Sequence, residues 1–147
     1  MAQGLLQKRL KELEHRLNDP IDVASAGIFA IEGMLPSKET LKLLQHEGVD
    51  LSNHMARGVT DEMIRQTDLI FVMEQFHLDE VLRRAPPAKG RVFLLKRFGV
   101  SNASADDNPH IPDPIGKPME VYEVCFATIR EAVERVAHVL LSPEKRP

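Results

Sequence analysis

The sequence has 147 residues and a mass of 16.6 kDa, which fits one globular domain. Hydrophobic residues make up 43% of the chain and charged residues 28%, a composition that excludes a disordered polypeptide. The net charge of -3 favours neither nucleic acid nor an anionic membrane as a partner. A single cysteine excludes an internal disulfide and a four-cysteine zinc site.

The sequence contains neither a membrane-spanning pattern nor a secretory signal. No apolar run approaches the roughly 20 residues that cross a bilayer. The first residues, Met-Ala-Gln-Gly, lack the basic-then-apolar order of a signal peptide. We therefore expect a soluble cytoplasmic protein.

The N-terminal half predicts three helices and one strand. Apolar residues at helical spacing predict an amphipathic helix over residues 5–17, and the small residues within 21–29 favour a strand that leads into a loop. Ser37 is the expected N-cap of a second helix that stops at Gly48, and Thr60 is the expected cap of a short third helix.

The C-terminal half predicts two strands and two helices. Residues 68–73 and 91–95 are short apolar runs typical of buried parallel strands, and helical spacing covers 76–84 between them. A polar loop over 99–118 precedes a last helix over 119–141. The apolar residues expected on or near one stripe of this helix are Val121, Val124, Cys125, Ile129, Val133, Val136 and Leu140.

Alternating strands and helices indicate an α/β fold with a parallel sheet covered by helices on both faces. Such folds bind ligands beyond the carboxyl ends of the strands, where a strand-to-helix turn presents backbone N–H groups. The first predicted helix has no strand before it, and only three strands are visible. An expected first strand is therefore missing from these residues.

Six stretches occur in the order and spacing of one protein family. They are residues 1–5 (Met-Ala-Gln-Gly-Leu), 23–27 (Val-Ala-Ser-Ala-Gly), 48–57, 68–73 with His77, 91–95, and 111–114 (Ile-Pro-Asp-Pro). On these stretches the chain resembles a bacterial low-molecular-weight protein-tyrosine-phosphatase, a family that includes protein-arginine-phosphatases. The resemblance implies a single phosphatase-like domain over residues 1–141, truncated at its N-terminus, and a C-terminal tail over 142–147.

The family fold is a four-stranded parallel sheet with helices on both faces. Its central first strand runs into a phosphate loop of the form Cys-x5-Arg-Ser/Thr-Pro, which many members follow with Met-Ala-Glu and the first helix. This sequence starts at the corresponding Met1. The resemblance therefore puts the strand, the nucleophilic cysteine and the phosphate-binding arginine upstream, and we expect this chain to be an inactive, truncated product.

The resemblance also implies a two-step displacement without a metal or other cofactor. A thiolate attacks phosphorus, and water then attacks the phosphocysteine. A carboxylic acid protonates the leaving oxygen and later activates the water. Asp113 matches this general acid, although Asp and Pro in a loop are also typical of a solvated turn.

Cys125 is not expected to be the nucleophile. Cys125 and Arg130 form Cys-x4-Arg, one residue short of the family spacing. They lie inside a helical pattern, whose backbone N–H groups bond within the helix and cannot surround an anion. We predict that Cys125 is a small buried hydrophobic residue.

Three residues match family positions around the phosphate loop. Ser25 and His54 correspond to a hydrogen-bond network that braces the loop, and Arg57 belongs to the same neighbourhood or forms a surface salt bridge. The six histidines show no HExxH or other paired spacing, so the pattern predicts no metal site.

The substrate cleft is expected at Phe29, Ile31 and Ile115. Tyrosine-specific relatives have aromatic walls, which hold a phenyl ring by stacking, at the places that Ile31 and Ile115 occupy here, and Phe29 is the nearest aromatic candidate in this chain. Their replacement leaves phosphotyrosine and phosphoarginine both open, in a protein or a small phosphate ester. The single cysteine argues against the related arsenate reductases, which need more thiols.

Two other interpretations remain open at this point. One is a non-catalytic pseudophosphatase that acts as a binding or regulatory module, and the other is a pair of chains joined through the gap in the sheet. Packing disfavours a pseudophosphatase without the first strand. Without that strand, the neighbouring strands would have unpaired backbone groups and a cavity of several side chains would remain. The cost of both would offset a typical free energy of folding.

Overall fold

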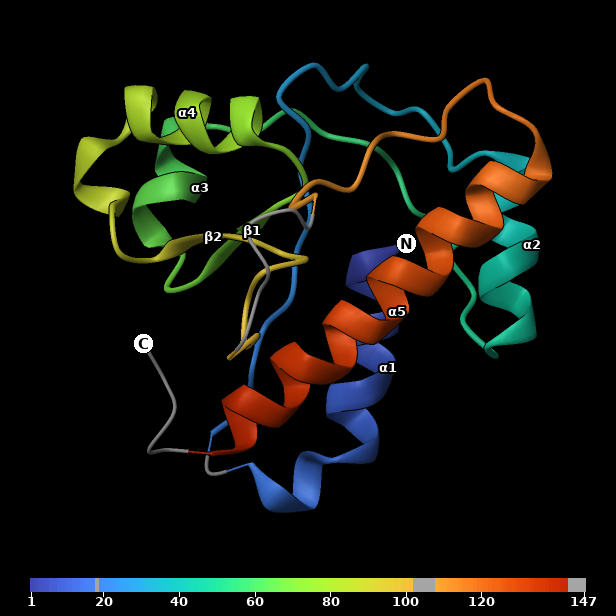
Figure 1. The fold of residues 1–147 in the computed structure, drawn as a ribbon, viewed down its shortest axis with the longest axis horizontal. Coiled ribbons are helices and arrows are strands. Elements are labelled where there is room, and N and C mark those ends of the chain that lie inside the picture. Colours follow the sequence, from blue (N-terminus) through green and yellow to red (C-terminus); the bar gives the residue numbers. More distant parts are fainter. Residues whose placement is uncertain (18, 102–107, 143–147) are drawn as a thin grey trace.

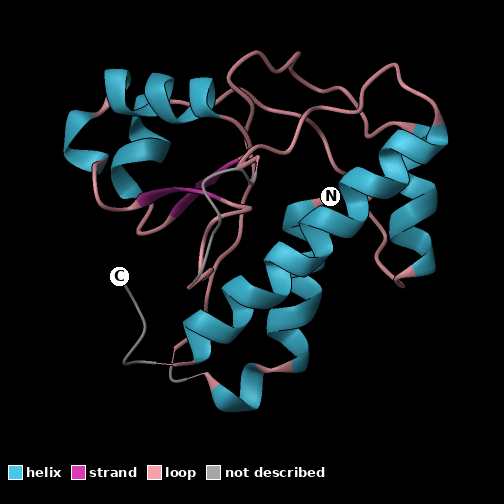
Figure 2. Ribbon diagram, viewed as in Figure 1, coloured by secondary structure: helices cyan, strands magenta, loops and turns pink. Residues whose placement is uncertain are grey.

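A computed structural model describes residues 1–17, 19–101 and 108–142 (Figures 1 and 2). The helices are α1 (Ala2–Glu12), α2 (Lys38–His46), α3 (Asp61–Gln66), α4 (Gln75–Arg84) and α5 (Met119–Leu141), with short 3-10 turns at Glu14–Arg16 and Pro86–Ala88. The strands are β1 (Ile70–Val72) and β2 (Val92–Leu94). None of the described helices is both long and apolar enough to cross a membrane.

Helix α5 organises the larger of two hydrophobic cores. Figure 1 shows α1 lying along α5, and α2 contacts α5 near its first turns. The buried residues of α5 are Tyr122, Cys125, Phe126, Ile129, Ala132, Val133, Val136, Ala137, Val139 and Leu140. The bounds predicted for this helix are confirmed, but the inclusion of Val121 and Val124 in the buried stripe is wrong. These two side chains are 43% and 69% exposed, because the buried stripe passes through Tyr122 and Phe126 instead.

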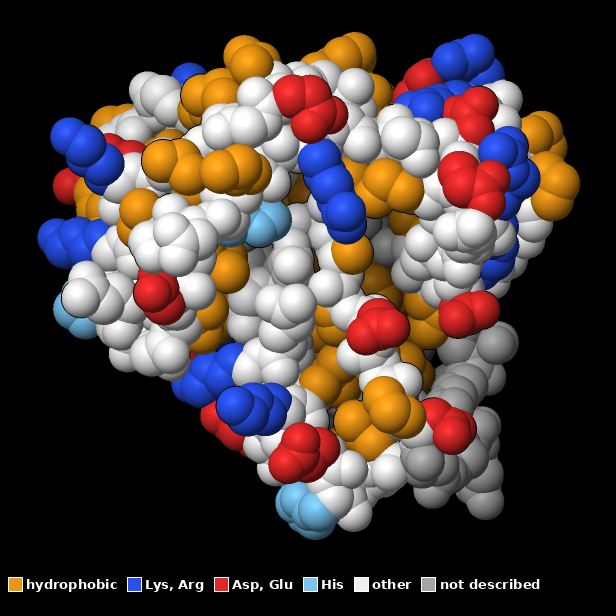
Figure 3. Space-filling model, turned by 180° about the vertical axis from the view of Figure 1, so that it is seen from behind, with side chains coloured by type: hydrophobic (Ala, Val, Ile, Leu, Met, Phe, Trp, Pro, Cys, Tyr) orange, Lys and Arg blue, Asp and Glu red, His pale blue; other side chains and the backbone are white. Residues whose placement is uncertain are grey.

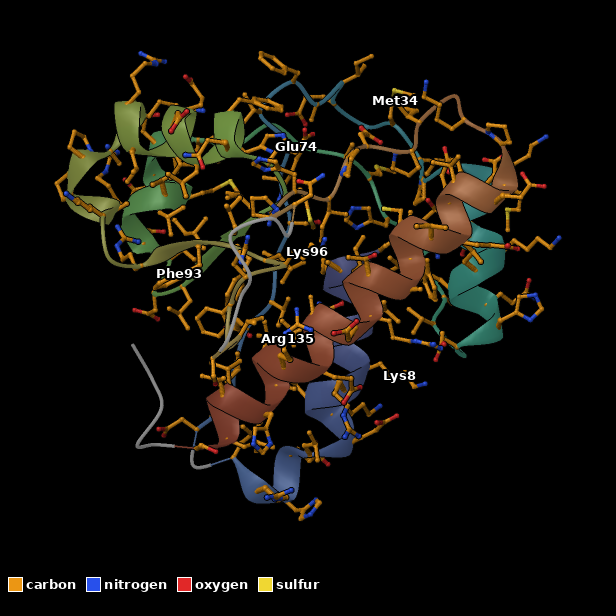
Figure 4. All side chains as sticks on the ribbon, in the orientation of Figure 1. Lys8, Met34, Glu74, Phe93, Lys96 and Arg135 are labelled. Atoms are coloured by element: carbon orange, nitrogen blue, oxygen red, sulfur yellow. The ribbon has the colours of Figure 1, made fainter. Side chains whose placement is uncertain are left out.

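One arginine of α5 forms hydrogen bonds with the segment that follows the carboxyl end of β2. Arg135 donates hydrogen bonds to the carbonyl oxygens of Lys96 at 2.8 Å and Phe98 at 3.4 Å (Figure 4). Phe98 is buried in the core of α5, where its ring meets Phe71 edge-on at a centroid distance of 4.8 Å. The strands are thereby fixed against the long helix.

The smaller core lies between the sheet and the helices α3 and α4. It contains Ile64, Val72, Val81, Ala85, Ala88 and Val92. Arg91 closes one side of this core, because its guanidinium donates to the carbonyl oxygens of Ile64 (2.8 Å) and Thr67 at the end of α3. These carbonyls lack partners within the helix, so Arg91 serves as a side-chain cap.

Most predicted helices and their caps are confirmed. Ser37 accepts a hydrogen bond from the Thr40 N–H at 3.2 Å, and Thr60 accepts one from the Met63 N–H at 3.1 Å. Gly48 follows α2 with a φ of +70°, as expected of a glycine after a helix end. The first helix is shorter than the predicted 5–17, because α1 ends at Glu12 and the chain continues as a 3-10 turn.

The predicted strand over 21–29 is wrong as a regular strand. Among the described residues, this segment forms only one bridge, between Gly27 and Gly58. Side chains bind two of its carbonyl groups: Gln7 Nε2 donates to Val23 at 3.0 Å, and Arg57 Nε donates to Ser25 at 3.0 Å. The segment is extended, but a strand requires a continuous backbone partner, which the described residues do not supply.

The sheet consists of β1 and β2, paired in parallel. The Ile70 N–H donates to Arg91 at 2.8 Å and the Val72 carbonyl accepts from Leu95 at 2.9 Å, so Ile70 and Val72 face β2. By the alternation of a parallel ladder, the N–H and C=O of Phe71 point to the opposite edge. No described strand pairs with that edge, which leaves β1 as an open edge.

The cap that Arg91 provides predicts a stability difference between two arginines. Arg91→Ala should lower the free energy of unfolding by about 1 kcal/mol, because it removes a charged donor from helix-end carbonyls that are part-buried at Ile64 and exposed at Thr67. Arg83→Ala is the matched control, since Arg83 is 71% exposed and its ion pair, with Glu80, lies within its own helix. Chemical denaturation measures both. Equal stabilities of the two variants would contradict the assignment.

Candidate active site

Loops from distant parts of the sequence meet at the carboxyl end of β1. The Ile111 N–H donates to the Met73 carbonyl at 2.9 Å, directly after the strand ends. Glu74 follows at the start of α4, as labelled in Figure 4. Carboxyl ends of parallel strands are where α/β folds bind ligands. The Met73–Ile111 hydrogen bond therefore brings the Asp113 loop to the expected place for a site.

Asp113 is an exposed carboxylate held by its own loop. Its Oδ1 accepts a hydrogen bond from the Ile115 N–H at 3.0 Å, which forms an Asx turn. Cys125 of α5 lies behind the loop, with its Sγ 3.8 Å from the Pro112 carbonyl oxygen. The turn fixes the backbone around Asp113 while the carboxylate stays accessible, as proton transfer to a substrate requires.

His77 lies within the electrostatic reach of Asp113. Burial lowers the pKa of His77, and the carboxylates of Glu74 and Asp113 act in the opposite direction. The Glu74 N–H donates to Nδ1 of His77 at 3.2 Å, so the neutral ring carries its proton on Nε2. His77, in the first turn of α4, is therefore electrostatically coupled to the Asp113 loop.

Ser25 is joined to the first turn of α1. Its Oγ donates to Gln3 Oε1 at 2.5 Å, and its carbonyl accepts the bond from Arg57. The structure therefore brings together Ser25 and Arg57, as expected, and no carboxylate in the described chain forms an ion pair with Arg57. Gln3 is a partner that the sequence did not single out.

His54 lies in the turn that follows Leu51. Its backbone N–H donates to the Leu51 carbonyl at 3.0 Å, and the residue is half-buried. Within residues 1–17, 19–101 and 108–142, no hydrogen bond to its imidazole is found. His54 is therefore placed in the same loop as Arg57 without a direct link to Ser25.

The three residues predicted to line the cleft are all exposed. Phe29 is 84% exposed, and Ile31 and Ile115 are each 67% exposed. Phe29 stacks on Phe76 with a centroid distance of 6.4 Å and an interplanar angle of 17°, and Phe76 lies 3.9 Å from the ring of His77. Sequence reasoning missed Phe76. Its place just beyond the carboxyl end of a predicted strand was the available signal.

Cys125 has the properties of a structural residue. It is buried within α5, and both burial and the nearby Asp113 carboxylate raise the pKa of its thiol. A nucleophilic cysteine requires a lowered pKa. The prediction that Cys125 is a buried hydrophobic residue is confirmed, and the described part of the chain has no cluster of three potential metal ligands.

The fold and these loops define a low molecular weight phosphatase, and comparison with known proteins agrees. The family model described as low molecular weight phosphotyrosine protein phosphatase matches residues 1–145, so the chain belongs to this family of phosphoric monoester hydrolases. The family fold predicted from the sequence is thus confirmed. Within its 147 residues the sequence contains no Cys-x5-Arg.

The particular relatives fall into two substrate groups. A protein-arginine-phosphatase from Geobacillus stearothermophilus is 32% identical over 128 residues, which cover 87% of this chain and 82% of that protein. The protein-tyrosine-phosphatase Wzb from Salmonella typhimurium is 26% identical over 137 residues, which cover 93% and 87% of the two chains.

Solved structures give the same result for the fold. The arginine phosphatase YwlE from Geobacillus stearothermophilus superposes with a TM-score of 0.79 at 28% identity, covering 97% of this chain and 84% of that one. Wzb from Escherichia coli K30, in complex with sulphate, superposes with a TM-score of 0.76 at 26% identity, covering 93% and 85%.

The closeness of His77 and Asp113 predicts a coupled titration. The pKa of His77 should lie below the ordinary histidine value, and Asp113→Asn should lower it further, because the substitution removes a charge that favours the imidazolium. Because the pKa of His77 is lower in the folded chain than in the unfolded chain, the free energy of unfolding should decrease as the pH falls below the ordinary pKa of histidine. NMR titration of the imidazole measures this.

Asp79→Asn is the control for this titration, since Asp79 lies on the same helix and does not act on His77. A His77 pKa that ignores Asp113→Asn, or that responds equally to both substitutions, would contradict the geometry.

Proposed function

We propose that this chain is the scaffold of a protein phosphatase in which Asp113 is the general acid and base. The observation that carries the proposal is the Met73–Ile111 hydrogen bond, which holds the Asp113 loop at the carboxyl end of β1. Substrates are phosphorylated proteins or smaller phosphate esters, the class on which the family acts. The described residues place no thiolate nucleophile at the carboxyl end of β1, so a phosphocysteine on which Asp113 could act requires a further cysteine.

The nucleophile comes from a Cys-x5-Arg loop outside these 147 residues. Its thiolate attacks phosphorus, the bond to the leaving oxygen breaks, and Asp113 donates its proton to that oxygen. Asp113, now a carboxylate, takes a proton from water as the water oxygen attacks the phosphocysteine. Phosphate leaves, and the thiolate and the protonated Asp113 are restored.

The open edge of β1 supports a place for this loop. Phe71 presents an N–H and a C=O that no described strand uses, and a parallel strand bonded there would end beside Glu74 and the Asp113 loop. The extended segment 21–29 also lacks a backbone partner along most of its length. A central strand between the two would satisfy both, which extends the domain beyond residues 1–141.

Ser25 and His54 are proposed to brace that loop, and Phe29, Ile31 and Ile115 to line the cleft. The Ser25–Gln3 hydrogen bond supports the first role, because it lies at the N-terminus of α1, where backbone N–H groups favour an anion. The Phe29–Phe76 stack offers a flat face to either a phenyl or a guanidinium group. We also propose a cytoplasmic location, in keeping with a sequence that has one cysteine.

A complementation experiment tests the proposal. The 147-residue chain should not hydrolyse 4-nitrophenyl phosphate. The same chain extended at its N-terminus by the first strand and Cys-x5-Arg loop of the Geobacillus protein should hydrolyse it. In the extended protein, Asp113→Asn should lower kcat by about 10²-fold or more.

Two substitutions serve as controls. Cys125→Ser should retain activity, because its thiol is buried in α5, and so should Glu123→Gln, an exposed carboxylate on the same helix. Turnover by the unextended chain would overturn the need for an outside nucleophile. A folded extended protein that binds phosphate but never turns over would favour the alternative, a pseudophosphatase that acts as a binding module.

A further inference from the structure

Exposed hydrophobic side chains are concentrated around the proposed site. Ten large hydrophobic residues are exposed in the described chain, and six of them lie on three loops, at 27–36, 53–58 and 108–118. Phe29, Ile31 and Ile115 belong to the cleft. The other three are Met34, Leu35 and Met55, which we name the apolar ledge; they are 49%, 58% and 63% exposed.

Backbone hydrogen bonds join the apolar ledge into one surface. The Gly33 N–H donates to the Ala56 carbonyl at 2.9 Å, and the Ala56 N–H donates to the Met34 carbonyl at 2.8 Å. Two residues thus face one, with Gly33 at a φ of +77°, which is the pattern of a glycine bulge. The bulge brings residues 34 and 35 alongside 55 and 56, although 20 residues separate them in the sequence.

The apolar ledge is continuous with the site. The bridge between Gly27 and Gly58 ties the same two loops together, and Phe29 on the first loop stacks on Phe76 beside His77. Met34 and Glu74 lie at the same end of the molecule in Figure 4. In Figure 3, hydrophobic side chains gather along the upper edge, the end at which these loops lie in Figure 1.

The side chains of the apolar ledge do not contribute to the hydrophobic cores. Contiguous exposed apolar surface marks interaction sites, and methionine suits surfaces that adapt to varied partners. The charged residues nearby are committed to the backbone, because Glu32 accepts from the Gly58 N–H at 2.6 Å and Arg57 donates to Ser25. The surface offered to a partner therefore combines the exposed apolar side chains with two charged residues, Glu32 and Arg57, that hydrogen bonds hold in place.

We propose that the apolar ledge binds hydrophobic residues next to the phosphorylated residue of an extended polypeptide substrate. The inference rests on the proposed function, because a protein phosphatase must accept a polypeptide across the loops that surround its acid. An extended chain advances about 3.3 Å per residue, so two or three residues beyond the phosphorylated one reach outside a cleft. Recognition then depends on hydrophobic flanks as well as on the phosphate.

The chain extended by the family strand and Cys-x5-Arg loop, with the cysteine of that loop replaced by serine to prevent turnover, can test this inference. Fluorescence polarisation compares two labelled phosphotyrosyl peptides of equal length and charge, one with Leu and Met flanks and one with Ser flanks. The hydrophobic peptide should bind about fivefold more tightly or better. Met34→Glu and Met55→Glu should each remove most of that preference.

Val100→Glu is the matched control, because Val100 is an exposed hydrophobic residue outside the three loops. Equal binding of both peptides, or no binding of either, would overturn the inference. So would a doubled mass by light scattering that Met55→Glu abolishes, since a second copy would then occupy the ledge. If the flank preference holds while the extended protein with its loop cysteine intact shows no hydrolysis, the proposed function fails and the docking surface remains.

Discussion

The burial of one face of helix α5 is the constraint on which the rest of the structure depends. This 23-residue helix supplies ten buried side chains, and α1, α2 and the turn after β2 all pack against it. The chain enters α5 directly from the loop that carries Asp113, and Cys125 lies behind that loop. Packing of α5 therefore helps to set where the Asp113 carboxylate lies.

The second determinant is the pair of strands whose carboxyl ends lie at the candidate site. β1 ends at Val72, and the carbonyl of the next residue, Met73, accepts the hydrogen bond that holds the Asp113 loop, while Arg135 bonds the segment after β2 to α5. The same strand has an edge that no described strand covers. A scaffold that holds the Asp113 loop at the end of β1, yet leaves the neighbouring edge of β1 open, is consistent with the proposal of a nucleophile carried by a strand that bonds to β1.

Local sequence predicts those elements whose hydrogen bonds and burial are local. The bounds of α5 and two helix N-caps follow from spacing and capping chemistry. The prediction of a strand over 21–29 is wrong because local sequence does not specify the backbone partner that a strand needs. The prediction for Val121 and Val124 is wrong because the buried stripe of this long helix passes through Tyr122 and Phe126 instead. Asp113 could be assigned only through family resemblance, since nothing local separates it from a solvated turn.

Hydrogen exchange at the open edge of β1 tests the central claim most directly. In the 147-residue chain, the Phe71 amide should exchange much faster than the Ile70 amide, which donates to the Arg91 carbonyl. In the chain extended by a family strand and Cys-x5-Arg loop, the Phe71 amide should slow to the rate of Ile70. The account would be contradicted if the Phe71 amide already exchanged slowly in the unextended chain, or if its exchange rate did not change when the strand was added.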